Sequence, residues 1–182
     1  MPRTEIRVAG FGGQGVVLAG VILGRAACLH DGKHATQTAT YGPEARGGAA
    51  HSEVVISDEP VDFPEVEEAD ILVAMSQETL NRHLKSLKEG GTLLVDADLV
   101  PDIPQGKRLV LHRIPATSVA SEELGRRVVA NMVMLGAVVG ATSAVSEKAL
   151  KAAVKESIPA GTEELNIRAV ERGISLAQQA AT

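Results

Sequence analysis

The sequence predicts an α/β fold, and three observations support this prediction. A short apolar run at residues 6–9 stops at a glycine cluster, and an almost unbroken apolar segment then continues to Leu29. This pattern is typical of a strand, a tight turn and a helix. Strands and amphipathic helices alternate again from Ala69, and the last third of the chain reads as helices alone. We therefore expect one Rossmann-like, three-layer domain over residues 1–182, with a mostly parallel sheet and a helical C-terminal third.

The first turn has the spacing G-x-G-x-x-G at Gly10, Gly12 and Gly15. Without Cβ atoms, such a loop can adopt positive φ and let a ligand or another chain touch the backbone. The helix that follows, residues 16–30, carries about half a positive charge at its N-terminus, which favours a phosphate or a carboxylate. A glycine-rich turn that serves packing alone is the alternative. Because this helix is apolar nearly all round, we expect it to lie between the sheet and another layer.

A second glycine-rich loop, residues 41–48, separates two further predicted strands. The first, residues 34–40, is rich in threonine, and the second, residues 49–56, alternates in polarity. A loop of about eight residues between two strands favours a hairpin rather than a βαβ crossover.

The remaining elements follow from short buried-type runs and capped amphipathic segments. Strands are predicted at residues 71–74, 92–95 and 108–112, and helices at residues 77–87, 118–124, 126–139, 146–155 and 162–178. Ser76 is the predicted N-cap of the first of these helices, Gly90-Gly91 its end, and Thr117 or Ser118 the cap of the second.

Composition restricts the class of protein. A net charge of −5 and an aromatic content of 2% argue against a nucleic-acid partner, which needs basic patches and stacking platforms. The apolar stretch at residues 16–29 is too short for a membrane span, so we expect a cytoplasmic protein without membrane contact. The single cysteine, Cys28, rules out an intramolecular disulfide and a self-contained iron–sulfur site, and we expect it to be a buried thiol.

A dinucleotide site would need an acid at the end of the second strand to hold the adenosine ribose. That strand ends in Ala39-Thr40-Tyr41; Asp31 comes too early and Glu44 lies in the following loop. An ordinary NAD site is therefore doubtful.

We identify no catalytic residue and no metal ligand set. The five histidines are scattered, and the elbow of a serine hydrolase and the lysine of a phosphate-binding loop are missing. Asp96 and Asp98 resemble a metal pair, but we expect them to solvate a loop at a strand end. Three segments, residues 10–15, 41–48 and 75–77, should meet at the carboxyl edge of the sheet, where open α/β sheets bind ligands.

The two glycine loops are recognisable together. GFGGQG at residues 10–15 and QTATYGPEARGG at residues 37–48 resemble the γ subunit of 2-oxoacid:ferredoxin oxidoreductases, and the resemblance covers residues 6–139. It continues through Ser52-Glu53-Val54, Ser76-Gln77-Glu78, Pro115-Ala116-Thr117 and Asn131-Met132. The motif YGPEARGG is most similar to the 2-oxoglutarate type, whereas pyruvate and branched-chain types usually depart from it after the Pro-Glu.

The resemblance implies a division of labour between subunits. The complex would decarboxylate 2-oxoglutarate oxidatively to succinyl-CoA and pass electrons to ferredoxin, using thiamine diphosphate, Mg, an iron–sulfur cluster and coenzyme A. The α and β subunits, or a ferredoxin-like δ subunit, would hold the thiamine diphosphate and the clusters. The γ subunit would pack over the site where coenzyme A enters, and alone it would bind no cofactor and be inert.

The residues that we expect to contact the coenzyme or partner subunits lie mostly in the two loops. They are Gly10, Gly12, Gly13, Gln14, Gly15, Tyr41, Gly42, Pro43, Glu44, Arg46, Gly47, Gly48, Ser76 and Asn131. Asn131 could instead be a satisfied core amide. A pyruvate- or branched-chain-specific γ subunit, a free-standing nucleotide-binding protein and a pure scaffold remain as alternatives.

Overall fold

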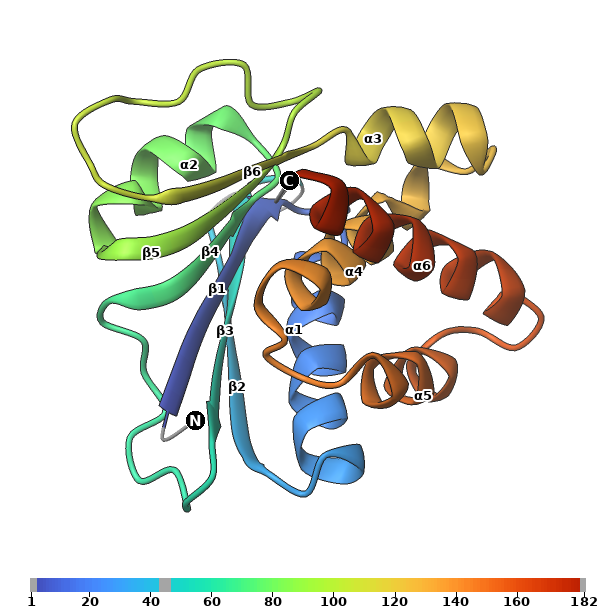
Figure 1. Cartoon of the computed structure of the whole chain (residues 1–182), viewed down its shortest axis with the longest axis horizontal. Helices are drawn as coiled ribbons and strands as arrows, with labels where there is room; N and C mark the ends of the chain where they lie inside the picture. The colour runs from blue at the N-terminus through green and yellow to red at the C-terminus, as the bar shows by residue number, and fades with distance from the viewer. Residues whose placement is uncertain (1–2, 43–46, 181–182) are drawn as a thin grey trace.

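A six-stranded mixed sheet forms the centre of the protein in the computed structural model, which describes residues 3–42 and 47–180 (Figure 1). The strand order is β2-β3-β1-β4-β5-β6. The strands are β1 (Arg3–Phe11), β2 (His34–Tyr41), β3 (Ala49–Ser57), β4 (Ala69–Ala74), β5 (Leu87–Asp96) and β6 (Val110–Ile114). The pairs β1–β4, β4–β5 and β5–β6 are parallel, and β3 is antiparallel to both of its neighbours. The prediction of a mostly parallel sheet is confirmed.

The β2–β3 hairpin is the exception to the parallel pattern. Its register runs from His34 opposite Ser57 to Tyr41 opposite Ala50, so the second glycine-rich loop joins two antiparallel strands as predicted. A parallel crossover needs a dozen residues or more, which this connection lacks. As a result β3 lies between β1 and β2.

Helices cover the two faces of the sheet unequally. On one face lie α1 (Val16–Arg25), α4 (Ala130–Thr142), α5 (Glu147–Ser157) and α6 (Glu163–Ala180), and on the other lies α2 (Gln77–His83) (Figure 1). The short α3 (Ala116–Ser118) follows β6 at the carboxyl end of the parallel strands. A π-helical turn, Ala26–His30, extends α1, and α1 packs between β3 and α5. The three-layer α/β prediction is confirmed.

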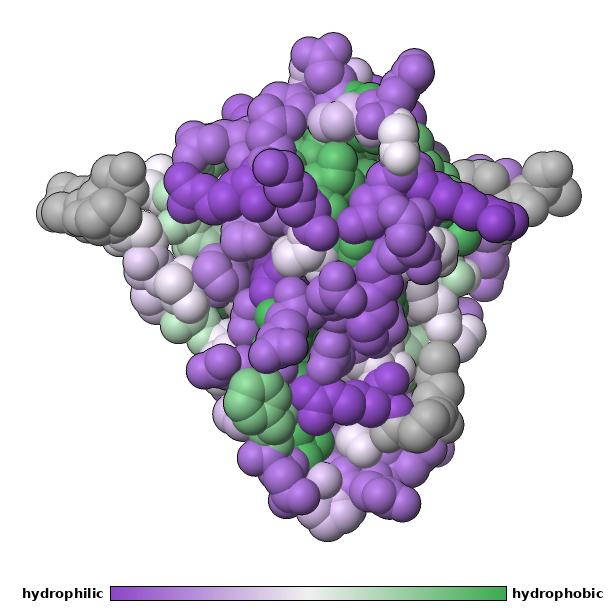
Figure 2. Space-filling model, turned by 90° about the vertical axis from the view of Figure 1, so that its left-hand side faces the viewer, coloured by the Kyte–Doolittle hydropathy of each residue, from purple (hydrophilic) through white to green (hydrophobic). Residues whose placement is uncertain are grey.

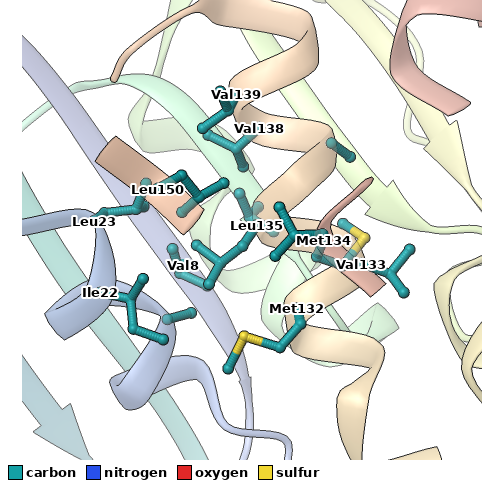
Figure 3. Close-up of a cluster of buried hydrophobic side chains, with 14 of the residues drawn as sticks. Val8, Ile22, Leu23, Met132, Val133, Met134, Leu135, Val138, Val139 and Leu150 are labelled. Atoms are coloured by element: carbon teal, nitrogen blue, oxygen red, sulfur yellow. The ribbon is translucent and has the colours of Figure 1, made fainter. Parts of the chain in front are cut away.

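The larger core fills the space between the sheet and the four-helix face, and it is aliphatic. Val8 of β1, Ile22 of α1, Leu135 of α4 and Leu150 of α5 converge there (Figure 3). Their exposed fractions are 2% or less. Helix α4 is buried on nearly every side, because it lies between the sheet and α6. Its strongly apolar sequence follows from this position.

The opposite side of the molecule is mainly hydrophilic. Figure 2 shows this side, which carries α2, and hydrophobic residues reach its surface only in small separate areas. Beneath α2 a smaller core holds Leu72, Leu80 and Leu93. Within residues 3–42 and 47–180, no helix is long and apolar enough to cross a membrane.

Several predicted boundaries are wrong, each for a local reason. The helix predicted at residues 77–87 ends at His83, and a 3-10 turn, Leu84–Ser86, leads into β5, which already begins at Leu87. Gly90 and Gly91 therefore lie inside a strand, where Gly90 has a φ of 76° and the register with β4 shifts. This is a bulge, a position where glycine is common in strands.

The segment before α4 also differs from its prediction. The helix predicted from residue 126 starts as a 3-10 turn at Arg127–Val129 and becomes α-helical only at Ala130. Strand β6 lies two residues later than predicted. Because of the 3-10 start, Arg126 and Arg127 lie exposed on a turn before α4 and not on a regular helix.

Candidate functional site

The turn after β1 is held together by the side chain of Gln14. Its Oε1 accepts a hydrogen bond of 2.6 Å from the Phe11 N–H, and its Nε2 donates one of 2.9 Å to the Met75 carbonyl. The amide therefore ties the carboxyl ends of β1 and β4 together. A Cβ on Gly10 would lie 2.5 Å from this Oε1, which explains the glycine at that position.

Asn131 holds the other end of the turn. Gly15 has a φ of 74° and is the N-cap residue of α1, and a Cβ there would lie 2.3 Å from Asn131 Nδ2. That nitrogen donates a 3.3 Å hydrogen bond to the Gly15 carbonyl, and Asn131 is 4% exposed. The Asn131 amide thus has a partner within the fold, and Asn131 also lines a cleft beside Gly13, so its contact with a ligand stays a prediction.

The N-terminus of α1 offers hydrogen-bond donors without a competing acid. No side chain caps this helix, and its first turn contains no acidic residue. The first N–H groups of an uncapped helix attract anions, and the helix dipole adds to the attraction. Gly13, with a φ of 91°, and Gly15 bring the backbone to this point without side chains of their own.

The two glycine loops touch each other. The Gly12 N–H donates a 2.8 Å hydrogen bond to the Gly48 carbonyl, and a Cβ on Gly12 would lie 3.4 Å from the Gly47 backbone. Gly42 closes the hairpin with a 2.7 Å bond to Ala49, and Tyr41 is 69% exposed. Three predicted site residues of this loop, Pro43, Glu44 and Arg46, lie outside the described residues. Gly47 and Gly48 of the second loop thus lie beside the first glycine loop, as predicted.

The side chain of Ser76 caps the N-terminus of α2. Its hydroxyl accepts a 3.3 Å hydrogen bond from the Thr79 N–H, which confirms the predicted N-cap of α2, and it lies 2.9 Å from the Thr79 hydroxyl. The residue is 5% exposed. Met75, which precedes it, bonds back to β1 through the Ala9 carbonyl. We define the glycine rim as residues 10–15, 75–77 and the described loop residues Tyr41, Gly42, Gly47 and Gly48.

Two clefts flank Gly13 on this rim. The first cleft, of about 250 Å³, is lined by Gly13, Gln14, Met75, Leu99, Thr117, Arg127, Val128 and Ala130. We name it the polar cleft after Gln14, Thr117 and Arg127, although most of its lining is apolar. The apolar cleft, of about 300 Å³, lies between α1, α4 and the start of α6, and Leu18, Met132 and Leu165 contribute to its wall. Gly13 and Val128 belong to both clefts, so the exposed Val128 separates them.

Two arginines that line these clefts are not among the site residues predicted from the sequence. Arg127 lines the polar cleft and Arg126 the apolar cleft; both are exposed, and neither has an ion pair with a described residue. They follow Gly125, whose φ of 71° turns the chain towards the rim. The sequence signal was a pair of adjacent arginines between a glycine and an apolar helix. Without the sheet order, nothing placed that pair beside the first glycine loop.

Asp96 and Asp98 do not merely solvate a loop. Asp96 is fully buried, and its carboxylate accepts hydrogen bonds of 2.6 Å from the Thr117 hydroxyl and 3.4 Å from the Thr117 N–H. Asp98 accepts bonds of 2.7 Å from both the N–H and the hydroxyl of Ser118. Burial raises the pKa of Asp96, and the bonds from Thr117 oppose that rise. The two aspartates thus bind the start of α3, so the predicted capping by Thr117 or Ser118 side chains is wrong.

The structure also corrects the expectation for Cys28. This thiol is exposed, because the π-helical turn rotates it to the outer side of the helix while Ala26 and Ala27 face the core. Among the described residues, no group of three or more histidine, cysteine or acidic side chains could hold a metal ion. The doubt about a dinucleotide site gains a structural reason: β3 separates β1 from β2, whereas in the dinucleotide fold these strands are neighbours.

The fold and the rim define a class of protein: an α/β domain with an anion-attracting glycine turn and two clefts, whose chemistry is suited to binding. Residues 5–176 match the family described as pyruvate ferredoxin/flavodoxin oxidoreductase, and the chain belongs to this family.

Similar proteins agree with this assignment. The chain is 54% identical over 179 residues to 2-oxoglutarate synthase subunit KorC of Methanothermobacter marburgensis, and the match covers 96% of both chains. The crystal structure of a keto/oxoacid ferredoxin oxidoreductase γ subunit from Geobacter sulfurreducens matches with a TM-score of 0.87 and 44% identity, covering 97% of this chain and 99% of that one. A 2-oxoglutarate:ferredoxin oxidoreductase from Magnetococcus marinus, with 2-oxoglutarate, coenzyme A and succinyl-CoA bound, matches with the same TM-score and 25% identity. It covers 98% of this chain, which corresponds to 32% of the longer Magnetococcus chain.

Proposed function

We propose that the chain is the γ subunit of a 2-oxoglutarate:ferredoxin oxidoreductase and that its glycine rim forms the coenzyme A side of the assembled active site. The complex converts 2-oxoglutarate and coenzyme A to succinyl-CoA and carbon dioxide and passes two electrons to ferredoxin. Full-length identity of 54% to a 2-oxoglutarate synthase subunit supports this substrate over pyruvate or a branched-chain 2-oxoacid.

The observation that carries the proposal is the charge arrangement at the rim. The uncapped N-terminus of α1, Arg126 and Arg127 all adjoin Gly13. Coenzyme A has a diphosphate and a ribose phosphate, so it needs several cationic or N–H donors at a short spacing. Arginine suits such anions because its planar guanidinium can donate two parallel hydrogen bonds. Glu44 and Arg46 of the second loop remain candidates for the same contacts or for contacts to partner subunits.

The rest of the reaction belongs to the proposed partners, the α and β subunits and a ferredoxin-like δ subunit. Thiamine diphosphate supplies the carbanion chemistry of decarboxylation, and the iron–sulfur cluster conducts the electrons. A cluster needs several thiolates, whereas this chain has one cysteine, which is exposed and remote from the rim residues. The residues of this chain therefore fit a role in binding and orienting coenzyme A and in closing the site against water.

Arginine variants in the reconstituted complex test this role. Arg126→Ala and Arg127→Ala should each raise the KM for coenzyme A about ten- to a hundred-fold, because a hydrogen bond to a charged group contributes about 1.5–3 kcal/mol. The KM for 2-oxoglutarate should stay the same. Arg108→Ala is the matched control, because Arg108 is an exposed arginine near the opposite edge of the sheet. If neither rim variant changes the KM for coenzyme A more than Arg108→Ala does, the proposed role of the rim is wrong.

A further inference from the structure

Thr117 occupies an unusual position in the polar cleft. It lies at the start of α3, where its hydroxyl donates a 2.6 Å hydrogen bond to the fully buried Asp96. The same residue contributes to the cleft wall together with Gly13, Gln14 and Arg127. The helical segment that begins at α3 continues as a π-helical turn, Val119–Glu123. Thr117 therefore combines a bond that fixes its hydroxyl with a place in the wall of a ligand-sized cleft.

The neighbouring Ser118 shows what capping alone looks like. Its hydroxyl and N–H both donate to Asp98 at 2.7 Å, so this pair holds the helix start as the Thr117–Asp96 pair does. Asp98 is exposed, and Ser118 is not among the residues that line the polar cleft. Two adjacent hydroxyls therefore share one structural role, and they differ in their access to the cleft.

The buried carboxylate also determines the direction in which the Thr117 hydroxyl donates its proton. An ionised aspartate can only accept, so the hydroxyl proton must point to Asp96. The lone pairs of the hydroxyl oxygen are then left for a donor on another molecule. Asp96 also accepts a 3.2 Å bond from the Asp98 N–H, which further restricts its orientation.

We propose that Thr117 is a ligand-binding residue of the polar cleft, whose hydroxyl accepts a hydrogen bond from an N–H or O–H group of coenzyme A while Asp96 positions it. The identity of the ligand rests on the proposed function. Coenzyme A carries such donors in its two amides, its adenine amine and its hydroxyls. Arg127, on the same cleft, attracts the phosphates, and Thr117 adds a neutral contact that distinguishes coenzyme A from a simple anion.

Three variants in the reconstituted complex test the proposal. Thr117→Val keeps the shape of the side chain and removes the hydroxyl, so the KM for coenzyme A should rise about three- to ten-fold with kcat nearly unchanged. Thr117→Ser restores the hydroxyl and should return the KM to within about two-fold of the native value. Ser118→Ala removes the matched hydroxyl outside the cleft and should leave the KM for coenzyme A unchanged. Melting temperatures of the three variants report the structural cost separately.

The outcomes separate this inference from the proposed function. If Thr117→Val lowers the melting temperature but leaves the KM for coenzyme A unchanged, Thr117 is a structural residue and the inference is overturned. An equal rise in KM for Ser118→Ala would overturn it as well. If Arg127→Ala raises the KM while Thr117→Val does not, the rim still binds coenzyme A and only the Thr117 assignment fails. If Thr117→Val, Arg127→Ala and Arg126→Ala all leave the KM for coenzyme A unchanged, the proposed role of the glycine rim fails.

Discussion

At the scale of single residues, a buried charged network lies beneath α2, away from the glycine rim. Arg7 of β1 is 7% exposed and bonds Glu53 of β3 through Nη2 at 2.6 Å and Nε at 2.9 Å. Beside it, the rings of His51 and His83 meet edge to face at a centroid distance of 4.8 Å. The pKa of His83 is lowered to about 4, chiefly by burial and then by the charges of His51, Arg7 and Arg82, while Glu53 acts in the opposite direction. Burial also lowers the pKa of His51.

This network predicts a loss of stability in mild acid. The folded pKa of His83 lies below its ordinary value of 6.5, so the unfolded chain binds more protons than the native chain between pH 6.5 and 4. Stability is therefore complete above pH 6.5 and falls as the pH drops towards 4. We expect His83 to account for on the order of 1–2 kcal/mol of this fall, less than full burial would give because the ring is partly accessible.

Urea unfolding of the His83→Gln variant over this pH range measures that contribution. The variant should lose less stability than the native chain between pH 6.5 and 4, because glutamine does not titrate. His34→Gln, at an exposed histidine, is the control and should keep the native pH dependence. A native-like slope in His83→Gln would show that His83 does not cause the acid sensitivity.

Side-chain roles that depend on neighbours in the chain could be predicted from the sequence more easily than roles that depend on distant residues. Ser76 was predicted as a cap because its hydroxyl and the helix that follows are adjacent in the chain. The roles of Asp96 and Asn131 depend on Thr117 and Gly15, which are distant in sequence and meet only through the sheet order. The exposure of Cys28 likewise depends on the π-helical turn. Local chemistry was predictable, and so was the meeting of the glycine loops at one sheet edge, whereas the individual side-chain contacts of Asp96 and Asn131 were not.

At the scale of elements, the helix glycines fall into two groups. In one group a neighbouring backbone occupies the position that a Cβ would take, and in the other that position is free. A Cβ on Gly136 of α4 would lie 2.0 Å from the Val170 carbonyl oxygen, and one on Gly173 of α6 would lie 1.9 Å from that of Val133. Helices α4 and α6 therefore touch backbone to backbone. In α1, a Cβ on Gly24 would meet only the Gln37 Cβ, at an ordinary contact distance of 3.8 Å.

Matched glycine-to-alanine changes should therefore have opposite signs. Gly136→Ala must push α6 away and should reduce the free energy of unfolding by about 1–3 kcal/mol or more, as overpacked cores do. Gly24→Ala should increase it by up to about 1 kcal/mol, because alanine favours helix and here meets no obstacle. Denaturant unfolding of both variants measures the difference. Equal destabilisation by the two changes would contradict the packing described for α4 and α6.

The elements themselves could largely be predicted from periodicity, but their ends could not. Helix α2 and strand β5 carry a continuous leucine pattern, Leu80, Leu84 and Leu87, that fits a single helix. The structure places Leu87 on a strand because β4 offers it a parallel partner at Ala69. The tertiary partner outweighs the local helical pattern at this boundary.

At the scale of the whole molecule, the sheet order brings the recognition groups to one edge. The carboxyl ends of the parallel strands place the first glycine loop, the start of α2, Asp96 and α3 on the same side of the sheet. The two most exposed large apolar side chains of the described residues, Val128 at 71% and Tyr41 at 69%, also adjoin this edge. The sheet order thus gathers the N–H donors of the first glycine turn and both clefts at one edge, as the proposed coenzyme A-side role requires.

Omission and re-addition of this chain in the purified complex test the central claim most directly. The measurement is ferredoxin reduction that depends on both 2-oxoglutarate and coenzyme A. We expect partner subunits without this chain to lose coenzyme A-dependent turnover, the added chain to restore it in proportion to its amount, and the chain alone to reduce no ferredoxin. Undiminished turnover without this chain, or turnover by the chain alone, would contradict its assignment as the subunit that supplies the coenzyme A side of the site.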